Sequence, residues 1–254
     1  MAAWHLIETW GAAPGFAMGL DEALLRSVGR APTLRLYSWA PDALSLGYFQ
    51  RFDDVPAAAA HPNVVRRLTG GGAIHHHAQE LTFSVTLDAD DPAYRGSVPD
   101  SYERAHEAVI HALAALGVAS PRMRREEPVG SDLAGTGMCF HESTPQDICW
   151  TGPAGALAKG VGTAQRRTAG RILHHGSIKL GPSPLEAEVA TAADSAVSID
   201  AQAAGAALRA AFAREFEVEL RPTAPDADLL ASAQQMAARY SDPDFVHREP
   251  RPRR

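Results

Sequence analysis

The chain has 254 residues, 45% hydrophobic content, a formal net charge of -6 and a pI near 6.0. This composition is typical of globular proteins and excludes disordered and fibrous classes. The acidic balance gives no overall attraction to nucleic acid or anionic membranes, so we expect neither as a partner. We also expect no secretory leader or membrane span. The two cysteines, Cys139 and Cys149, form no disulfide framework, which favours a reducing cytoplasm.

Hydrophobic periodicity in the first part of the chain predicts a strand, a helix and then a hairpin. In the helix, Asp21 and Glu22 fall on the face opposite the apolar residues. The predicted elements are a strand over 4–10, a helix over 15–26, two hairpin strands over 33–39 and 43–48, and a short helix over 57–60. Pro41 and Asp42 separate the two hairpin strands.

The second half of the chain predicts helices around a further set of strands. A helix over 101–116 has Asp100 as its expected N-cap and Gly117 as its expected C-cap. Glycine and charged residues over 122–137 predict a mobile loop. The remaining predicted elements are strands over 147–150, 156–162 and 172–180, and helices over 206–216 and 228–240.

Strands and helices mixed without regular alternation indicate an α+β fold with a mixed, largely antiparallel sheet and packed helices. We expect one domain over residues 1–254, with a helical C-terminal part from about residue 201. The end of the chain, 247–254, is expected to be frayed.

A glycine-rich stretch lies between two predicted strands, 64–65 and 81–87. Arg66 and Arg67 come first, and three glycines follow at positions 70–72. Residues without a Cβ let a ligand lie against backbone N–H groups, and the arginines would add positive charge at the rim of such a site. The alternative is a simple glycine-rich hairpin.

Several motifs around this stretch resemble the biotin and lipoate protein ligase superfamily. The resemblance covers nearly the whole chain and rests on residues 34–39, 46–50, 66–74, His76 and 80–84. It implies the catalytic-domain fold of biotin and lipoyl ligases. With these motifs attached, the glycine stretch is a specific signal for a substrate site.

Further motifs are similar to the cysteine-dependent octanoyltransferases of this superfamily. They are residues 138–140, 147–148, 158–167 and 174–178. In that branch a cysteine before a phenylalanine carries the acyl group and a lysine completes a dyad, and Cys139 and Lys159 occupy these positions. The ATP-dependent ligases share the lysine but generally lack the cysteine.

The resemblance implies a substrate pocket formed by the glycine stretch and the lysine-containing run. Its expected residues are Arg67, Gly70, Gly71, Gly72, His76, Gly162, Thr163 and Ala164. Backbone N–H groups near either run would hold a tetrahedral oxyanion. We expect no cofactor. We also expect no metal, because His75, His76 and His77 alternate across a strand and all three cannot ligate one ion.

A thiolate accepts an acyl group from a thioester when its pKa falls below the usual value, and a neighbouring ammonium has this effect. Lys159 is either that ammonium or the acceptor of the thiol proton, and the sequence leaves both roles open. Cys149 lies in an apolar run and is expected in the core. Arg166 and Arg167 are either surface charges or contacts for an acidic carrier protein.

The resemblance therefore implies an acyltransferase, with octanoyl-acyl carrier protein as donor and a lipoyl domain or glycine cleavage H protein as acceptor. A close variant moves octanoyl or lipoyl groups between lipoylated proteins. Two alternatives are an ATP-dependent lipoate-protein ligase and a catalytically silent relative that only binds. Acyl chain length and oligomeric state stay open.

Overall fold

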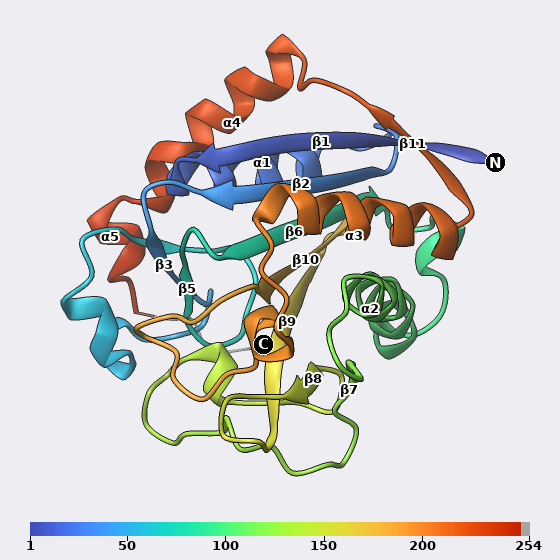
Figure 1. Ribbon diagram of the computed structural model, residues 1–254. Coiled ribbons are helices and arrows are strands. Elements are labelled where there is room, and N and C mark those ends of the chain that lie inside the picture. The colour runs from blue at the N-terminus through green and yellow to red at the C-terminus, as the bar shows by residue number, and fades with distance from the viewer. Residues whose placement is uncertain (250–254) are drawn as a thin grey trace.

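The structure, a computed structural model, describes residues 1–249, and a large mixed sheet forms its centre (Figure 1). Its strands are β1 (Ala2–Ala12), β2 (Thr33–Trp39), β6 (Glu80–Asp88), β7 (Arg122–Met123), β8 (Ile148–Thr151), β9 (Leu157–Arg167), β10 (Arg171–Lys179) and β11 (Val218–Pro222). Their order is β11-β1-β2-β6-β10-β9-β8-β7. β1 is parallel to β2 and β11, and the other neighbouring strands are antiparallel. The predicted α+β class is confirmed.

A second, smaller sheet contains β3 (Ala43–Leu46), β4 (Val64–Arg66) and β5 (Ile74–His76), in the order β4-β3-β5. The prediction that β2 and β3 form a hairpin is wrong. Both edges of β2 are already paired, with β1 on one side and β6 on the other, so β3 pairs elsewhere. The glycine-rich stretch is likewise no hairpin, because β4 and β5 lie on opposite sides of β3.

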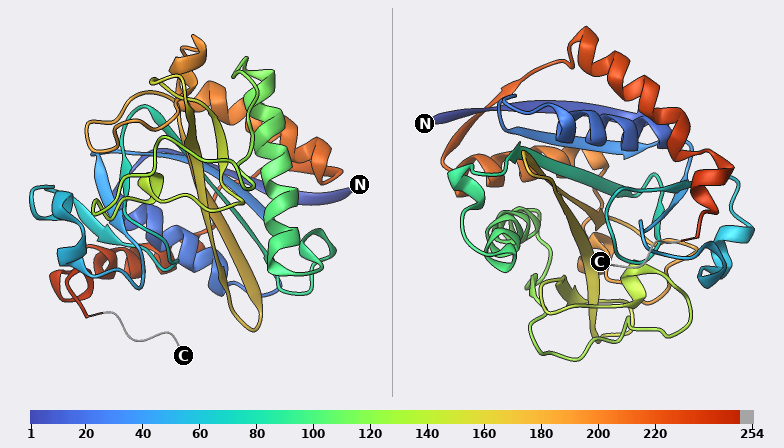
Figure 2. Two further views of the ribbon diagram at one scale, coloured as in Figure 1. Left: turned by 90° about the horizontal axis from the view of Figure 1, so that it is seen from below. Right: turned by 180° about the vertical axis from the view of Figure 1, so that it is seen from behind.

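Helices cover both faces of the large sheet. The α-helices are α1 (Pro14–Arg26), α2 (Val98–Ala115), α3 (Ala201–Glu215), α4 (Ala227–Tyr240) and α5 (Pro243–Val246). Short 3₁₀ helices are η1 (Phe52–Asp54), η2 (Pro56–Ala59), η3 (Pro92–Tyr94), η4 (Cys139–His141) and η5 (Ala192–Ser195). α3 packs beside α2 on one face, and α1 and α4 pack together on the other (Figures 1 and 2). Within residues 1–249, no helix is long and apolar enough to cross a membrane.

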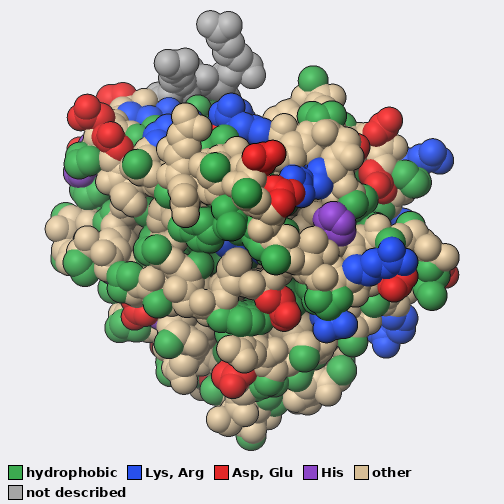
Figure 3. All heavy atoms as spheres, turned by 90° about the horizontal axis from the view of Figure 1, so that it is seen from above, with side chains coloured by type: hydrophobic (Ala, Val, Ile, Leu, Met, Phe, Trp, Pro, Cys, Tyr) green, Lys and Arg blue, Asp and Glu red, His purple; other side chains and the backbone are tan. Residues whose placement is uncertain are grey.

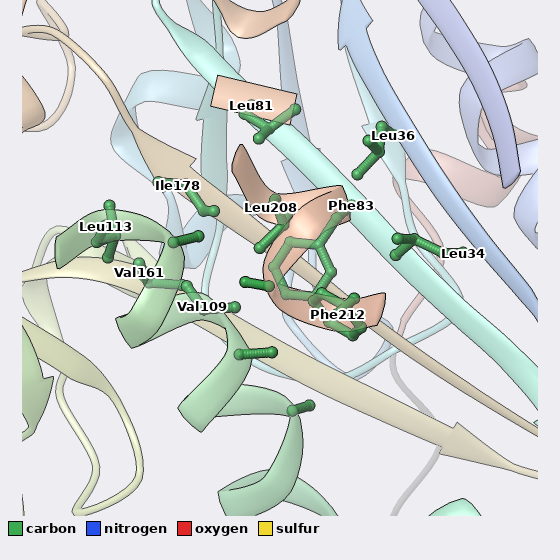
Figure 4. Close-up of a cluster of buried hydrophobic side chains, with 14 of the residues drawn as sticks. Leu34, Leu36, Leu81, Phe83, Val109, Leu113, Val161, Ile178, Leu208 and Phe212 are labelled. Carbon is green, nitrogen blue, oxygen red and sulfur yellow. The ribbon is translucent and has the colours of Figure 1, made fainter. Parts of the chain in front are cut away.

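The largest apolar core lies between the sheet and the pair α2 and α3 (Figure 4). Leu36 of β2 and Phe83 of β6 are buried there. Val109 of α2 and Phe212 of α3 close the cluster from the helix side. Alternate strand residues therefore point into this core, as the period-2 pattern requires. The other face packs against α1 and α4 with both apolar and polar side chains.

The face of the sheet below α1 holds a buried polar cluster. Asp21 and Arg35 are both fully buried, and Arg35 Nη1 donates to Asp21 Oδ1 at 2.7 Å. The expectation that Asp21 lies on a face of α1 opposite the apolar residues is wrong, because α1 is enclosed between the sheet and α4 and is buried from Ala17 to Leu25. Burial alone would raise the pKa of Asp21, but Arg35 and His175 lower it overall.

The start of α2 and the C-terminal end of the chain differ from the sequence prediction. α2 begins one turn early, with Ser97 as its N-cap and Asp100 as the partner in a capping box. In the tail expected to be frayed, the His247 ring stacks on Phe52 with 3.9 Å between centroids, and Arg248 donates to the carbonyl of Tyr48. Residues 250–254 lie outside the described residues.

Candidate active site

The glycine stretch and the segment that carries Cys139 are joined through their backbones. Cys139 N donates to the carbonyl of Ala73 at 2.7 Å, and Ala73 N donates to the carbonyl of Gly137 at 2.8 Å. A Cβ on Gly72 would lie 2.7 Å from Cys139 N, closer than real contacts allow. Glycine at position 72 is therefore required because the two segments touch. The result places the thiol at the edge of the glycine stretch.

Lys159 reaches the same place because β9 contains a bulge. Cys149 of β8 pairs with Lys159, and the preceding Ile148 pairs with Val161, so Gly160 is an extra residue in β9. Without the bulge, Lys159 and Gly162 would point to opposite faces of the strand. With it, both face Cys139: a Cβ on Gly162 would lie 3.2 Å from Lys159 Cε and 3.3 Å from Cys139 Sγ.

The two expected dyad residues are therefore neighbours in space. Lys159 Nζ lies 3.6 Å from Cys139 Sγ. The ammonium also contacts the carboxylate of Asp147 at 2.9 Å. Lys159 is only 2% exposed. Burial lowers its pKa, but the negative charges of Cys139 and Asp147 outweigh burial and raise the pKa above its ordinary value.

A narrow, largely apolar pocket begins at Cys139 and runs along the sheet face that α1 covers. Its lining comes from α1, β2, β6, β9, β10 and the glycine stretch. The predicted residues in its wall are Arg67, Gly70, Gly71, His76, Gly162, Thr163 and Ala164. Gly72 lines a second hollow, which shares Cys139, Gly71 and Thr163 with the pocket. The thiol thus lies where a narrow apolar pocket meets a wider polar mouth.

The arginines before the glycine stretch play a different part from the expected one. We predicted positive charge at the rim, but Arg66 and Arg67 are buried. Arg67 Nη2 donates to the carbonyls of Gly70 at 2.8 Å and Gly72 at 2.7 Å, so this guanidinium shapes the glycine stretch from inside. Burial lowers the pKa of Arg67, although its position beside Cys139 opposes that shift.

His76 is held in one orientation at the pocket wall. Its Nδ1 lies 2.6 Å from Glu80 Oε1, and its Nε2 lies 2.8 Å from the hydroxyl of Ser45. The ring stacks on Trp39 with 3.9 Å between centroids. Burial lowers the pKa of His76 despite the nearby carboxylate. A neutral ring that donates from Nδ1 to Glu80 then accepts at Nε2 from Ser45.

Comparison with known proteins places the chain in a family. Residues 13–204 match the family described as the lipoyl protein ligase A/B catalytic domain. The chain belongs to this family. Octanoyltransferase LipM of Kyrpidia tusciae is 32% identical over an alignment that covers 98% of this chain and 100% of the relative. Octanoyltransferase LipM of an Exiguobacterium species is 38% identical over 187 residues, which cover 70% of this chain and 66% of the relative.

A solved structure of this family supports the fold. The bipartite lipoate protein ligase of Thermoplasma acidophilum has a TM-score of 0.76 and 22% identity, covering 100% of this chain and 99% of the solved chain. At this identity the likeness shows the fold alone. The predicted fold of the biotin and lipoyl ligase catalytic-domain type is therefore confirmed.

This member of the lipoyl protein ligase A/B family also has contacts that the sequence reasoning missed. Asp147 was recognised only as part of a motif, and its ion pair with Lys159 was not foreseen. Ser45 was not singled out either, although it contacts both His76 and Arg67. An acidic residue directly before an apolar strand was the available signal for Asp147. Nothing in the local pattern marked Ser45, because its partners come from other segments.

The remaining candidate nucleophiles are few and buried. The sequence has 22 arginines but only two lysines, Lys159 and Lys179, which are 2% and 0% exposed. The positively charged side chains visible in Figure 3 are therefore arginines, and they are interspersed with acidic ones. Cys149 is buried as predicted, and burial raises its pKa to about 12. Cys139 is the more accessible of the two free cysteines.

Arg166 and Arg167, for which two roles were left open, lie at the end of β9. The guanidinium of Arg166 stands 5.3 Å from the ring centre of Tyr48. Arg167 is exposed, and its Nη2 donates to the hydroxyl of Ser101 at 2.7 Å. These contacts are compatible with both a surface role and a carrier-protein contact.

Proposed function

We propose that this chain is an octanoyltransferase that carries the acyl group on Cys139 and delivers it to a lysine of an acceptor protein. The observation that carries the proposal is the position of the Cys139 thiol, 3.6 Å from Lys159 Nζ and at the junction of an apolar pocket with a polar mouth. The curated relatives named octanoyltransferase support the same activity.

The site suits acyl exchange between thioesters. A positive charge beside the thiol favours the thiolate, which is the nucleophilic form of cysteine. The apolar pocket would hold the fatty chain, while the wider mouth would admit the donor thioester and later the acceptor amine. Transfer from one sulfur to another conserves the activation of the acyl group, and amide formation with the lysine amine then uses it. No ATP is needed for these steps.

The donor and the acceptor are part of the proposal. We propose acyl carrier protein as the octanoyl donor and a lipoyl domain or glycine cleavage H protein as the acceptor. The archaeal system that shares this fold pairs its ligase with an E2 lipoyl domain, which supports an acceptor of that class. A lipoylated protein as donor is the close variant. We also propose a reducing cytoplasm, where both cysteines would stay free, as they are in the structure.

Intact-protein mass spectrometry tests the proposal. The protein is mixed with octanoyl-acyl carrier protein without ATP, and Cys139→Ala is compared with Cys149→Ala as the matched control. We expect the wild type and the Cys149 variant to gain one octanoyl group that hydroxylamine removes, and the Cys139 variant to gain none. Both lysines are buried, so amide adducts on lysine should not obscure this result.

The opposite results identify the alternatives. If an acceptor is labelled only after ATP, magnesium and free octanoate are added, the chain is an ATP-dependent ligase and Cys139 is structural. If neither condition produces an adduct or a labelled acceptor, the chain is a binding relative without acyl transfer.

A further inference from the structure

The ammonium of Lys159 is surrounded by oxygen acceptors. Nζ donates to the carbonyl of Cys139 at 2.8 Å, to the carboxylate of Asp147 at 2.9 Å and to the carbonyl of Glu142 at 3.1 Å. An ammonium has three N–H groups, so these three oxygens can use all of them. The thiol sulfur, at 3.6 Å, is the most distant of the four contacts. At this distance the sulfur also accepts a hydrogen bond from the ammonium.

We infer that Lys159 is a permanently charged group during the reaction and that Asp147 is the positioning residue that keeps it so. This inference rests on the proposed function and deepens it, since it decides between the two roles that the sequence left open for Lys159. Lys159, an ammonium with three oxygens and the thiol sulfur as acceptors, donates to Cys139 and does not take up the thiol proton. It acts by its fixed charge, which favours the thiolate of Cys139.

Asp147 is itself held in place at the start of β8. Its Oδ2 accepts from the backbone N–H of Thr144 at 2.7 Å and from the hydroxyl of Thr144 at 3.1 Å. It is 5% exposed, so its attraction for Lys159 is only weakly screened by solvent. The other two acceptors of Lys159 are neutral carbonyls. Asp147 is thus the carboxylate that balances the buried ammonium whenever the thiolate has been consumed by acylation.

Among the titratable groups near Lys159, Asp147 is the carboxylate in direct contact with the ammonium. Cys149, in the strand paired with Lys159, stays a neutral thiol because burial raises its pKa to about 12. His106 of α2 is buried, and burial lowers its pKa to about 4, so it is neutral at pH 7. Tyr102 is neutral as well, because burial raises its pKa to about 12. Glu142 lines the mouth beside Lys159, and Cys139 carries no charge once the thioester forms.

The transfer balances without any proton moving to or from Lys159. The thiolate sulfur of Cys139 forms a bond to the carbonyl carbon of the donor thioester, and the donor leaves as a thiolate that takes a proton from water. The acceptor ammonium first loses one proton to water. Its nitrogen then bonds to the carbonyl carbon, the bond to Cys139 Sγ breaks with its electron pair on sulfur, and the nitrogen releases a second proton. The thiolate is regenerated.

The other lysine of the chain provides an internal reference. Lys179 Nζ contacts three oxygens in the same manner: Glu80 Oε2 at 2.7 Å, Glu186 Oε2 at 2.6 Å and the carbonyl of His75 at 2.6 Å. Burial lowers its pKa, but the two carboxylates raise it overall. Asp147 should not affect Lys179, because the carboxylates that hold Lys179 are different ones.

Selective isotope labelling of lysine makes the test direct, because the chain has only two lysines. NMR of the side-chain Cε and Nζ of the full chain should give two signals, which Lys159→Arg assigns. We expect both signals to remain those of ammonium groups from pH 6 to 10. A Lys159 signal that titrates to the free amine within that range would overturn the inference.

The variant Asp147→Asn tests the positioning role, and Asp132→Asn is its control. Asp132 accepts from Ser143 nearby but does not hold Lys159. Both are studied in the Cys139→Ala background, which keeps the carbonyl acceptor at position 139. Loss of the Asp147 charge should lower the pKa of Lys159 by about 1 to 3, whereas the pKa of Lys179 stays unchanged. An unchanged Lys159 titration in a folded Asp147 variant would contradict the positioning role.

These measurements test the charge of Lys159 separately from the octanoyltransferase activity. If Cys139 is octanoylated but Lys159 titrates, the proposed acyl transfer is supported and the permanent charge of Lys159 is contradicted. If Lys159 stays charged but no octanoyl adduct forms, the inferred charge state is supported and the proposed acyl transfer is contradicted.

Discussion

Lys159 and Gly162 point to the same side of β9 although they are three residues apart, and both face the sulfur of Cys139. The extra residue at Gly160 causes this reversal of the strand alternation. The dyad therefore depends on a local irregularity of the strand. Space at position 162 is limited because the Lys159 side chain and the thiol both lie within contact distance of it.

The substitution Gly162→Ala should impair acyl transfer more than stability. The added Cβ would lie 3.2 Å from Lys159 Cε and 3.3 Å from Cys139 Sγ, so one of them must move by a few tenths of an ångström. Because reacting groups tolerate little displacement, we expect a loss on the order of 10-fold in the rate of octanoyl adduct formation. Mass spectrometry measures the rate, and thermal unfolding checks that the midpoint is retained. A rate equal to the wild type would show that the dyad is not constrained at this position.

Gly72→Ala should disturb the junction between the glycine stretch and the Cys139 segment. Its Cβ would lie 2.7 Å from Cys139 N and 2.9 Å from the carbonyl of Gly137, which are backbone atoms that cannot rotate away. We expect a loss of about 1 to 3 kcal/mol in the free energy of unfolding, measured in urea. The matched control is Gly70→Ala, whose Cβ would meet only a Phe49 ring atom at 3.7 Å. Equal stability of the two variants would contradict the close contact at Gly72.

Alkylation of the native protein should distinguish the two cysteines. Cys149 is fully buried and burial raises its pKa to about 12, so it has almost no thiolate at pH 7. Iodoacetamide should therefore add once to the native wild type, once to Cys149→Ala and not at all to Cys139→Ala. After denaturation the wild type should accept two groups. Labelling of Cys149 in the native protein, located by peptide mass spectrometry, would contradict this assignment.

Replacement of Asp21 by Asn should strongly destabilise the fold. Arg35 would remain fully buried without its carboxylate, and we expect a loss of about 3 to 5 kcal/mol at pH 7 in urea unfolding. The control Asp228→Asn, at an exposed position in the first turn of α4, should stay within about 0.5 kcal/mol.

The lowered pKa of Asp21 also predicts how the free energy of unfolding changes at low pH. The pKa of Asp21 is lower in the fold than in the unfolded chain, so its contribution is complete above about pH 4 and is lost as pH falls through the depressed folded pKa. The wild type should therefore lose stability toward low pH more steeply than Asp21→Asn. Parallel pH curves of the two proteins would show that another group controls acid unfolding.

Some features of the site could be predicted from local sequence. The motifs around Cys139 and Lys159 carried the family resemblance that implies a dyad of these two residues, and the alternation over 81–87 predicted β6. The boundaries of β2 agree with the predicted 33–39. These features depend on residues close together in the chain, where side-chain type and spacing carry the information.

Other features depended on which segments meet. The predicted hairpin failed because β1 and β6 already occupy both edges of β2, and β1 precedes it by many residues. The arginines expected at the rim are instead buried. Arg67 lies behind the glycine stretch and donates hydrogen bonds to its backbone carbonyls. Hydrogen-bond acceptors supplied by distant backbone leave no pattern in the local sequence.

The sequence alone thus determined the family resemblance, the strand and helix pattern, and the identity of Cys139 and Lys159 as partners. Only the tertiary structure shows where Lys159 lies and which groups contact its ammonium. Its bulge in β9 aims the side chain, and Asp147, Cys139 and Glu142 together provide oxygens for its three protons. The protonation of a buried amine is set by the charges and acceptors that folding brings around it, and these come from separate parts of the chain.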